Sequence, residues 1–395
     1  MTNKRFKQTI LILESGTQAL AILKSLHTIG SRIVMLVSSR GNYADVSKYV
    51  NEKIYTSLSV KSIEYFELVK SIIEEKHVDT IIPMGDLGAE FLSFHKEELL
   101  PLVRYKMPSH KNFLKGYDKN QLMALCREKG YPHPLTLDLS KLDYRDESNF
   151  ESFPYPGILK PNCTTGGRGM CIINDYSDLI NTYPRIRAEY GECHLQQFIR
   201  EGGSQVKLQL YINAEGDLLY SSVMEKVRWY PVKGGSSCCS VSIKKPEMVE
   251  ICHKILKDIH WIGFADFDTI GNPDTGELLI MEINPRLPAC IGAATCAGME
   301  WGQIIIDDYL GRPQKEYHFK EGVALRHLGF DILWFLKSPN RFKTKPSWFK
   351  FFGKNVFYQD FHFLDQKPFW IGTYHNIKKL FNPEFKKAKS GTSSI

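Results

Sequence analysis

The chain has 395 residues, a formal net charge of +7, 43% hydrophobic residues and 24% charged residues. These values are typical of a globular protein with two or three domains, and they exclude a disordered or collagen-like chain. No run of 18 apolar residues occurs, and the first apolar run ends at Glu14, so we expect neither a spanning helix nor a signal peptide. Nine cysteines without a CxxC pair favour the reducing cytoplasm over a disulfide scaffold or a zinc site.

The first hundred residues show the pattern of a parallel α/β domain. Residues 8–13 predict an apolar strand, residues 18–28 an amphipathic helix and residues 33–37 a second strand, which together make a βαβ unit. The stretch His77–Pro83 predicts a further strand. We therefore expect a doubly wound domain over residues 1–111.

Two positions in this domain bear on ligand binding. Gly16 stands alone after the first strand and lacks the GxGxxG spacing of a dinucleotide site, which argues against NAD. Asp86 follows the strand that ends at Pro83. Because open α/β sheets bind ligands at the carboxyl ends of their strands, we expect Asp86 to contact the substrate.

A glycine-rich loop follows a short apolar strand that ends at Lys160. Its candidate nucleotide contacts are Thr164, Thr165, Gly166, Gly167 and Gly169. Glycines allow backbone N–H groups to approach phosphate oxygens, and Lys160 supplies a positive charge. Residues 171–173 predict a strand after the loop, so the loop is not a Walker A motif, which opens a helix. A glycine-rich hairpin without a ligand is the alternative.

Two further candidates for substrate contact lie in the middle of the chain. Residues 207–211 and 218–222 predict strands around a turn, and the pattern continues to Arg228, whose side chain we expect to be free to point into the cleft. Ser236 lies in the following loop of small residues. A cationic strand beside such a loop could hold a substrate carboxylate, and a flexible surface loop is the alternative.

Acidic residues alternate along a predicted hairpin near residue 270. Asp266 and Asp268 share one face of its first strand, and Glu282 and Asn284 share one face of its second strand. A turn at residues 271–274 would bring the two pairs together. Three carboxylates in one patch repel each other unless cations lie between them. An exposed acidic hairpin is the alternative.

Arg286 follows this hairpin directly after Pro285. Carboxylate and amide oxygens are ligands that Mg²⁺ accepts, and a guanidinium group neutralises phosphate oxygens. The stretch Leu279–Arg286 therefore predicts a site for Mg²⁺ and a phosphate group.

In this order, Lys119, Lys160, the glycine-rich loop and the acidic hairpin resemble the ATP-grasp superfamily of ATP-dependent ligases. The resemblance is strongest to its carbamoyl-phosphate-synthetase-like branch, which includes predicted carboxylate–amine ligases and D-aspartate ligases, and it covers residues 8–312. It implies an α/β pre-ATP-grasp domain followed by an α+β ATP-grasp domain. The two lobes of that domain, residues 112–192 and 193–312, would hold ATP between them.

The resemblance also assigns roles to the nucleotide-binding positions. Lys119 and Lys160 match the two nucleotide lysines, and the loop Thr164–Met170 matches the flap over the phosphates. The hinge between the lobes, whose backbone meets adenine, matches Gln196, Gln197, Phe198 and Ile199. Glu201 is a candidate ribose contact. Gln197 stands where the family usually has a glutamate, so a side-chain acceptor at this position is a neutral amide.

The metal-binding positions follow in the acidic hairpin. Asp268, Glu282 and Asn284 match the metal ligands of the family, and Arg286 matches the arginine on the phosphate side. Asp268 is shorter than the Glu or Gln of other members, and Asp266 is therefore the alternative first ligand.

The implied reaction requires ATP and Mg²⁺, with Mn²⁺ as an alternative metal, and a small-molecule carboxylate and amine as substrates. Lys160 and Arg286 would act in catalysis by stabilising the γ-phosphoryl group during its transfer to the carboxylate. An amine would then attack the acyl phosphate to give an amide, ADP and phosphate. Two alternatives stay open: a carboxylase that forms carboxyphosphate, and an inactive nucleotide-binding protein recruited to membranes.

Residues 313–395 form a C-terminal extension that differs in composition from the rest of the chain. Its 15 Lys and Arg against 6 Asp and Glu give a net charge of +9, so the preceding residues sum to −2. Aromatic residues are frequent in it. We expect a packed appendage whose lysines face water, and peripheral contact with an anionic membrane is the alternative. Motifs of nucleic-acid-binding proteins are absent, so no nucleic acid partner is expected.

Overall fold

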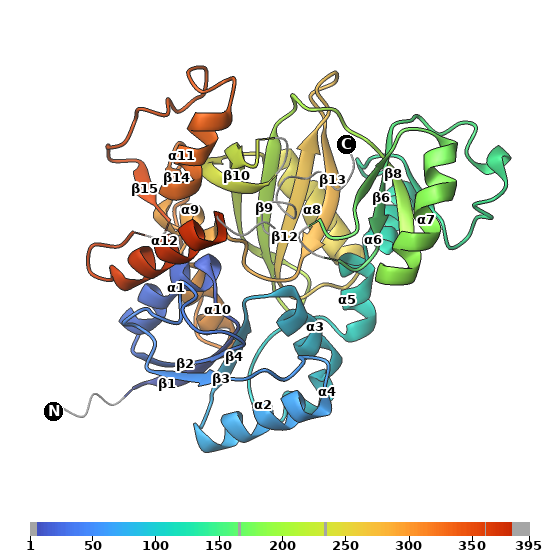
Figure 1. Ribbon diagram of the computed structural model, residues 1–395. Helices are drawn as coiled ribbons and strands as arrows, with labels where there is room; N and C mark the ends of the chain where they lie inside the picture. The colour runs from blue at the N-terminus through green and yellow to red at the C-terminus, as the bar shows by residue number, and fades with distance from the viewer. Residues whose placement is uncertain (1–5, 165–166, 233–234, 360, 381–395) are drawn as a thin grey trace.

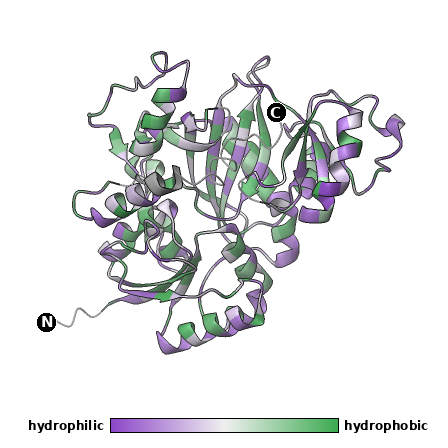
Figure 2. Cartoon of the chain, in the orientation of Figure 1, coloured by the Kyte–Doolittle hydropathy of each residue, from purple (hydrophilic) through white to green (hydrophobic). Residues whose placement is uncertain are grey.

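The computed structural model describes residues 6–164, 167–232, 235–359 and 361–380 (Figure 1). These residues form three β-sheets, each covered by helices. Figure 2 shows hydrophobic residues concentrated on the strands of the sheets, whereas the helices carry hydrophilic residues on part of their surface. No helix among the described residues combines the length and apolar character needed to cross a lipid bilayer.

The N-terminal sheet is parallel, with the strand order β3-β2-β1-β4. Its strands are β1 (Gln8–Leu13), β2 (Ser31–Val37), β3 (Glu52–Tyr55) and β4 (Thr80–Pro83). The helices of this part are α1 (Thr17–Thr28), α2 (Ile63–Glu75), α3 (Asp86–Phe94) and α4 (Lys96–Leu99). Every residue of β1 is buried, as expected for a central parallel strand that is covered on both faces. The expected strand–helix–strand unit is confirmed.

A small antiparallel sheet with the strand order β5-β8-β6-β7 forms the next part. Its strands are β5 (Thr136–Asp138), β6 (Gly157–Pro161), β7 (Cys171–Ile173) and β8 (Cys193–Gln197). Its helices are α5 (His110–Tyr117), α6 (Lys119–Lys129) and α7 (Tyr176–Tyr190), with a short 3₁₀ turn at Glu147–Asn149. Buried residues between Leu139 and Leu195 form a second hydrophobic core, separate from the main core. The strand predicted after the glycine-rich loop is confirmed as β7.

The largest sheet has seven strands in the order β13-β12-β9-β10-β11-β14-β15. These strands are β9 (Gln205–Ile212), β10 (Leu218–Tyr230), β11 (Ser236–Ile243), β12 (Gly263–Gly271), β13 (Leu278–Asn284), β14 (Ala324–Arg326) and β15 (Val356–Tyr358). The helices that follow in this part of the chain are α8 (Pro246–Asp258), α9 (Ile291–Cys296), α10 (Trp301–Tyr309) and α11 (Leu328–Lys337), and α12 (Lys367–Leu380) lies beside the N-terminal part, with Gly372 next to Tyr43. Helix α1 packs against α9 and α10, so the N-terminal sheet and the large sheet share one hydrophobic core.

The chain beyond residue 313 continues the large sheet. Strand β14 pairs antiparallel with β11, and β15 pairs parallel with β14. Helix α11 packs over β10 and β11 (Figure 1). The division of the chain at residues 111, 192 and 312 stays a prediction, although the last of these boundaries falls between strands of the same sheet.

Candidate active site

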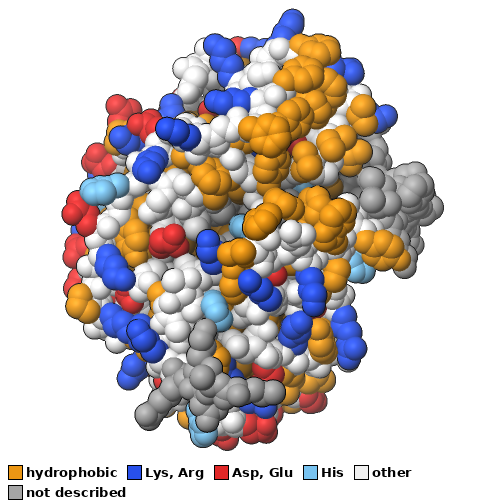
Figure 3. Space-filling model, turned by 90° about the vertical axis from the view of Figure 1, so that its left-hand side faces the viewer, with side chains coloured by type: hydrophobic (Ala, Val, Ile, Leu, Met, Phe, Trp, Pro, Cys, Tyr) orange, Lys and Arg blue, Asp and Glu red, His pale blue; other side chains and the backbone are white. Residues whose placement is uncertain are grey.

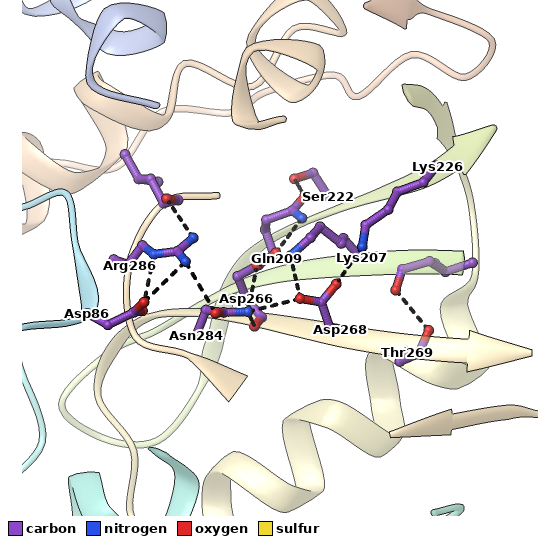
Figure 4. A network of polar contacts seen from close by, with 12 residues as sticks. Asp86, Lys207, Gln209, Ser222, Lys226, Asp266, Asp268, Thr269, Asn284 and Arg286 are labelled. Atoms are coloured by element: carbon purple, nitrogen blue, oxygen red, sulfur yellow. Dashed lines mark hydrogen bonds and ion pairs between the residues drawn. The ribbon is translucent and has the colours of Figure 1, made fainter. Parts of the chain in front are cut away.

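Strands β12 and β13 bring the predicted acidic residues together. The two strands pair antiparallel, with Asp266 opposite Asn284 and Asp268 opposite Glu282. The hairpin expected from the alternating sequence is therefore confirmed, and an irregularity in the pairing between Asp268 and Thr269, which was not expected, interrupts its register. Because β9 pairs with the other side of β12, its residues at matching positions also face this cluster (Figure 4).

Lys207 on β9 supplies the positive charge that holds two of these carboxylates together. Its Nζ lies 2.8 Å from Asp266 Oδ2 and 2.7 Å from Asp268 Oδ2. Lys226 on β10 adds a second ammonium group, 3.1 Å from Asp268 Oδ1. Burial raises the pKa of Asp266. Burial also opposes the ionisation of Asp268, but Lys207 and Lys226 together outweigh it and hold the pKa of that carboxyl well below its usual range.

Polar side chains extend this cluster into the sheet. Gln209 Nε2 donates a hydrogen bond of 2.8 Å to Asp266 Oδ1, and Ser222 Oγ donates one of 2.9 Å to Gln209 Oε1. Sequence reasoning missed Lys207 and Lys226. The signal was present, because Lys207 and Gln209 alternate with apolar residues in β9 and therefore share one face of that strand.

Glu282, Asn284 and Arg286 lie at the open side of the cluster. Lys119 Nζ is 3.3 Å from Glu282 Oε2, whose side chain is 32% exposed. Asn284 Nδ2 donates a hydrogen bond of 3.1 Å to Asp268 Oδ2. Arg286 Nε is 3.2 Å from Asp86 Oδ1, so the structure joins Asp86 of the N-terminal part to the residues after β13 (Figure 4).

Lys160 is buried at the end of β6. Its Nζ donates a hydrogen bond of 2.6 Å to Gln196 Oε1, and Gln196 Nε2 donates one of 3.0 Å to Thr136 Oγ1. Burial is the main cause that lowers the pKa of Lys160, to about 8. His194 is also buried, and desolvation together with the charge of Lys160 lowers its pKa well below the ordinary value. His194 is therefore neutral, and Lys160 is the cation of this part of the site.

Two neighbouring cavities lie beside the acidic cluster, and Lys160 is not among the residues that line them. The first has a volume of about 200 Å³ and is lined by Asp86, Tyr117, Lys119, Thr164, Lys207, Asp268, Glu282, Ile283, Asn284 and Arg286. The second has a volume of about 340 Å³ and is lined by Glu14, Gln18, Met84, Gly85, Asp86, Leu87, Tyr117, Cys163, Arg168, Arg286 and Ala289. They share Asp86, Tyr117 and Arg286. Neither Glu14 nor Gln18 was singled out from the sequence as a site residue.

The glycine-rich loop borders the smaller cavity through Thr164, whose carbonyl oxygen accepts a hydrogen bond of 2.9 Å from Lys119 Nζ. Gly169 has a φ of +74°, and a Cβ atom at this position would lie 2.8 Å from side-chain atoms of Pro161 and Tyr190. Glycine is therefore required here. Gly167 also has a positive φ, of +75°. Thr165 and Gly166 lie outside the described residues.

The remaining nucleotide candidates lie after β8. Gln197 ends this strand, and its N–H donates a hydrogen bond of 2.8 Å to the Leu135 carbonyl. Phe198 and Ile199 are half-buried, and Glu201 is exposed in a turn. The roles proposed for these residues with adenine and ribose stay predictions.

The expectation that Arg228 points freely into the cleft is wrong. Its side chain is fully buried and forms two hydrogen bonds with Asp331, at 2.6 Å from Nε and 3.0 Å from Nη2. The acidic partner comes from α11, beyond the region that the family resemblance covers, so it could not be paired with Arg228 from the sequence. Ser236 is exposed at the start of β11 and is not among the residues that line the two cavities.

The donor set around the smaller cavity is compatible with a divalent cation. Among the described residues, no group of three or more His, Cys, Asp and Glu side chains is arranged as a metal site. The cavity is lined by three carboxylates, of which Asp86 is paired with Arg286, and the predicted metal ligands Asp268, Glu282 and Asn284 offer it two carboxylates and one amide. These are hard ligands suited to Mg²⁺, which usually takes only one or two protein carboxylates and completes its shell with water and phosphate.

Comparisons with known proteins match part of this chain to carbamoyl-phosphate synthase. Residues 118–298 match the family model described as carbamoyl-phosphate synthase L chain, ATP binding domain. The chain is 26% identical over 178 residues to the C-terminal section of the carbamoyl phosphate synthase large chain of Methanopyrus kandleri, covering 43% of this chain and 32% of that protein. It is 23% identical over 283 residues to the D-aspartate ligase of Enterococcus faecium, covering 66% of this chain and 67% of that one.

A similar fold occurs in solved structures. N5-carboxyaminoimidazole synthetase from Staphylococcus aureus, complexed with ADP, superposes with a TM-score of 0.64 at 17% identity, covering 82% of this chain and 83% of that one. This chain spans only 32% and 49% of the length of the two Methanopyrus kandleri sections that it matches.

Proposed function

We propose that this chain, whose residues 118–298 carry an ATP-grasp domain of the carbamoyl-phosphate synthase type, is an ATP-dependent ligase that joins a carboxylate to an amine and releases ADP. One observation carries the proposal. Asp86, Lys119 and Glu282 come from three separate parts of the chain and line, together with Arg286, a single cavity of about 200 Å³. Such a cavity, with cations on its wall and hard oxygen ligands beside them, suits the terminal phosphates of a nucleotide.

In the first step, an oxygen of the substrate carboxylate attacks the γ-phosphorus of ATP. The bond between that phosphorus and the bridging oxygen breaks, and ADP leaves with the electron pair. Lys119 and Arg286 line the cavity and would bind the phosphate oxygens while their negative charge is redistributed. Asp268, Glu282 and Asn284 would hold Mg²⁺, which when bound supplies further positive charge at these oxygens.

In the second step, the amine nitrogen attacks the carbonyl carbon of the acyl phosphate. A C–N bond forms, the C–O bond to phosphate breaks, and phosphate leaves with the electron pair. An amine must first lose a proton if it binds as an ammonium ion. The loop with Thr164 lies at the cavity, where closure over the phosphates would exclude water from the acyl phosphate.

The larger cavity suits the amine substrate. Glu14 and Asp86 both line it, together with Arg168 and Arg286, so its wall offers carboxylates that could bind an ammonium group. Burial, followed by the nearby charge of Asp86, raises the pKa of Glu14. A carboxylate with a raised pKa can accept the proton that the ammonium ion must lose, and the second proton leaves with the phosphate.

The test is ADP release and product formation with MgATP and a panel of amino acids and small carboxylates, in the presence and absence of bicarbonate. We expect ADP and an amide, detected by mass spectrometry, only when both a carboxylate and an amine are supplied. Turnover that requires bicarbonate instead of another carboxylate would replace the ligase by a carboxylase. Absence of both ADP release and nucleotide binding would contradict the proposal.

A further inference from the structure

Part of the C-terminal extension carries only positive charge and exposes an unusual amount of apolar surface. Residues 332–358 contain five Lys and one Arg but no Asp or Glu. All five lysines are exposed: Lys337, Lys343, Lys345, Lys350 and Lys354. Large exposed hydrophobic residues alternate with them, namely Ile332 (42%), Leu336 (60%), Phe342 (74%), Phe349 (58%), Phe352 (88%) and Phe357 (36%). We call these eleven residues the aromatic–basic surface.

Two of the exposed rings belong to one packed cluster. Phe342 and Phe349 have ring centroids 6.3 Å apart, and both contact Phe335. Phe335 in turn stacks on Trp348 with a centroid distance of 4.1 Å. Figure 3, which faces the side of the molecule where α11, α12 and β15 lie, shows hydrophobic side chains gathered over one part of the surface with Lys and Arg around them.

Buried ion pairs fix the loop that carries these rings. Asp331 accepts hydrogen bonds from Arg228 and, at 2.6 Å, from Arg326. Arg228 also donates to the carbonyl oxygen of Pro346 at 2.8 Å, and Arg326 donates to that of Lys350 at 3.0 Å. The loop is therefore held against the large sheet at two points. Its aromatic side chains are exposed although their backbone is anchored, which indicates a built surface.

We propose that the aromatic–basic surface docks on a lipid bilayer that contains anionic lipids. An exposed apolar patch of this kind marks an interaction site on a soluble protein. Aromatic rings and leucine side chains partition into the interfacial region of a bilayer, and lysines beside them are attracted to anionic headgroups. The absence of any acidic residue from 332–358 matches the negative charge of such a membrane surface. This surface is separate from both cavities of the candidate active site, so the inference does not depend on the proposed ligase activity.

The test is co-sedimentation of the full chain with vesicles of phosphatidylcholine alone or with about 30% phosphatidylglycerol. We expect binding to the anionic vesicles only, and weaker binding as salt is raised, because salt screens the lysines. Replacing the three most exposed rings together (F342S, F349S, F352S) should weaken binding about tenfold or more. Reversing two lysine charges (K343E, K345E) should weaken it by a similar factor.

The matched control is F94S, because Phe94 is 62% exposed but lies on α3 in the N-terminal part. This variant should bind like the unaltered protein, and circular dichroism should show all variants folded. Equal binding by the triple-ring variant would overturn the proposal, as would equal binding to both kinds of vesicle. A dimer in analytical ultracentrifugation that the triple-ring variant abolishes would instead assign the surface to a second copy of this chain. Capture of a DNA oligonucleotide without vesicle binding would likewise overturn the lipid assignment.

Discussion

The large sheet carries two clusters of carboxylates and cations, and they differ in their access to solvent. At one side of the sheet, Lys207 bridges Asp266 and Asp268 next to a cavity. At the other side, Arg228 and Arg326 both bind Asp331, and the side chains of all three are at most 1% exposed. In the first cluster the Asp268 side chain is 19% exposed beside the cavity, whereas the Asp331 side chain is 0% exposed and both of its carboxylate oxygens are bound by guanidinium groups.

The comparison shows why a charged residue on a strand does not by itself predict a functional site. Arg228 and Lys207 are both cations in strands of the same sheet, and the sequence suggested the former for substrate binding. The decisive difference is the position of the partner carboxylate. Asp331 belongs to α11, which covers the sheet and seals the pair, whereas Asp268 belongs to a strand whose neighbour β13 ends beside the cavity. The four predictions below test this difference, in decreasing order of expected effect.

Removing Asp331 should have the largest effect on stability. D331A would leave two buried guanidinium groups without a counterion, and we expect a loss of about 3–5 kcal/mol in the free energy of unfolding. Urea denaturation measures it, with E215A at an exposed turn as the control. Nucleotide binding by the folded fraction should persist. A stability equal to that of the control would show that the sealed cluster contributes nothing.

Changing Glu282 should lower the activity but leave the stability almost unchanged, the opposite of the effect expected for Asp331. E282Q keeps the shape of the side chain but removes a charge at the cavity, and we expect the rate of ADP release to fall about 100-fold. The free energy of unfolding should change little, because this side chain is 32% exposed. E277Q is the matched control, since Glu277 is exposed at the turn end of the same hairpin. Equal losses of activity in the two variants would remove Glu282 from the site.

Removing the ammonium group of Lys207 should weaken the dependence of stability on pH. In the unaltered protein the depressed pKa of Asp268 contributes stability above the unfolded pKa, and that stability is lost as the pH falls through acidic values. K207M removes the main cation that depresses this pKa and leaves Lys226 to oppose burial, so the pKa of Asp268 should rise and the gain in stability with rising pH should become smaller. We expect K207M to be destabilised by about 2 kcal/mol at pH 7. Thermal unfolding of both proteins between pH 3 and pH 7 measures how much their stability changes with pH.

Glu14 should show the smallest effect on stability. Its folded pKa is raised above the ordinary 4.5, so its ionisation costs stability as the pH rises from the unfolded pKa through the folded pKa. E14Q should therefore be slightly more stable than the unaltered protein at pH 7 and equal to it below pH 4. With a substrate pair identified, the same variant should raise the KM for the amine while leaving the KM for ATP unchanged. A change confined to the KM for ATP would contradict the placement of the amine in the larger cavity.

The sequence was most informative where the chemistry is local. Alternation along Asp266–Asp268 and Glu282–Asn284 predicts which side chains of the hairpin share one face, because a strand exposes every second side chain on that face. Contacts between distant segments were the difficult part. The pair Asp86–Arg286 joins residues 200 positions apart, and each member was proposed as a site residue without the other being recognised as its partner.

Residues that were missed in the acidic cluster are those whose partners lie far away in the sequence. The acidic hairpin was expected to need cations beside it, and Lys207 and Lys226 supply two of them from β9 and β10. Neither lysine could be assigned to the cluster until the order of the strands was known, because pairing between β9 and β12 crosses more than fifty residues of sequence. The backbone of Glu14, with a φ of +74°, positions its carboxylate against Gly85 in a way that periodicity does not encode.

The pairing of β14 with β11 has a practical consequence for how the protein can be divided. A fragment ending at residue 312 would lack β14, β15 and α11, and the backbone N–H and C=O groups of β11 that normally bond to β14 would be left open. An uncovered sheet edge of this kind recruits strands from other molecules. We therefore expect a fragment that ends at residue 312 to aggregate. Strands β14 and β15 cover the edge of the large sheet that β11 would otherwise expose.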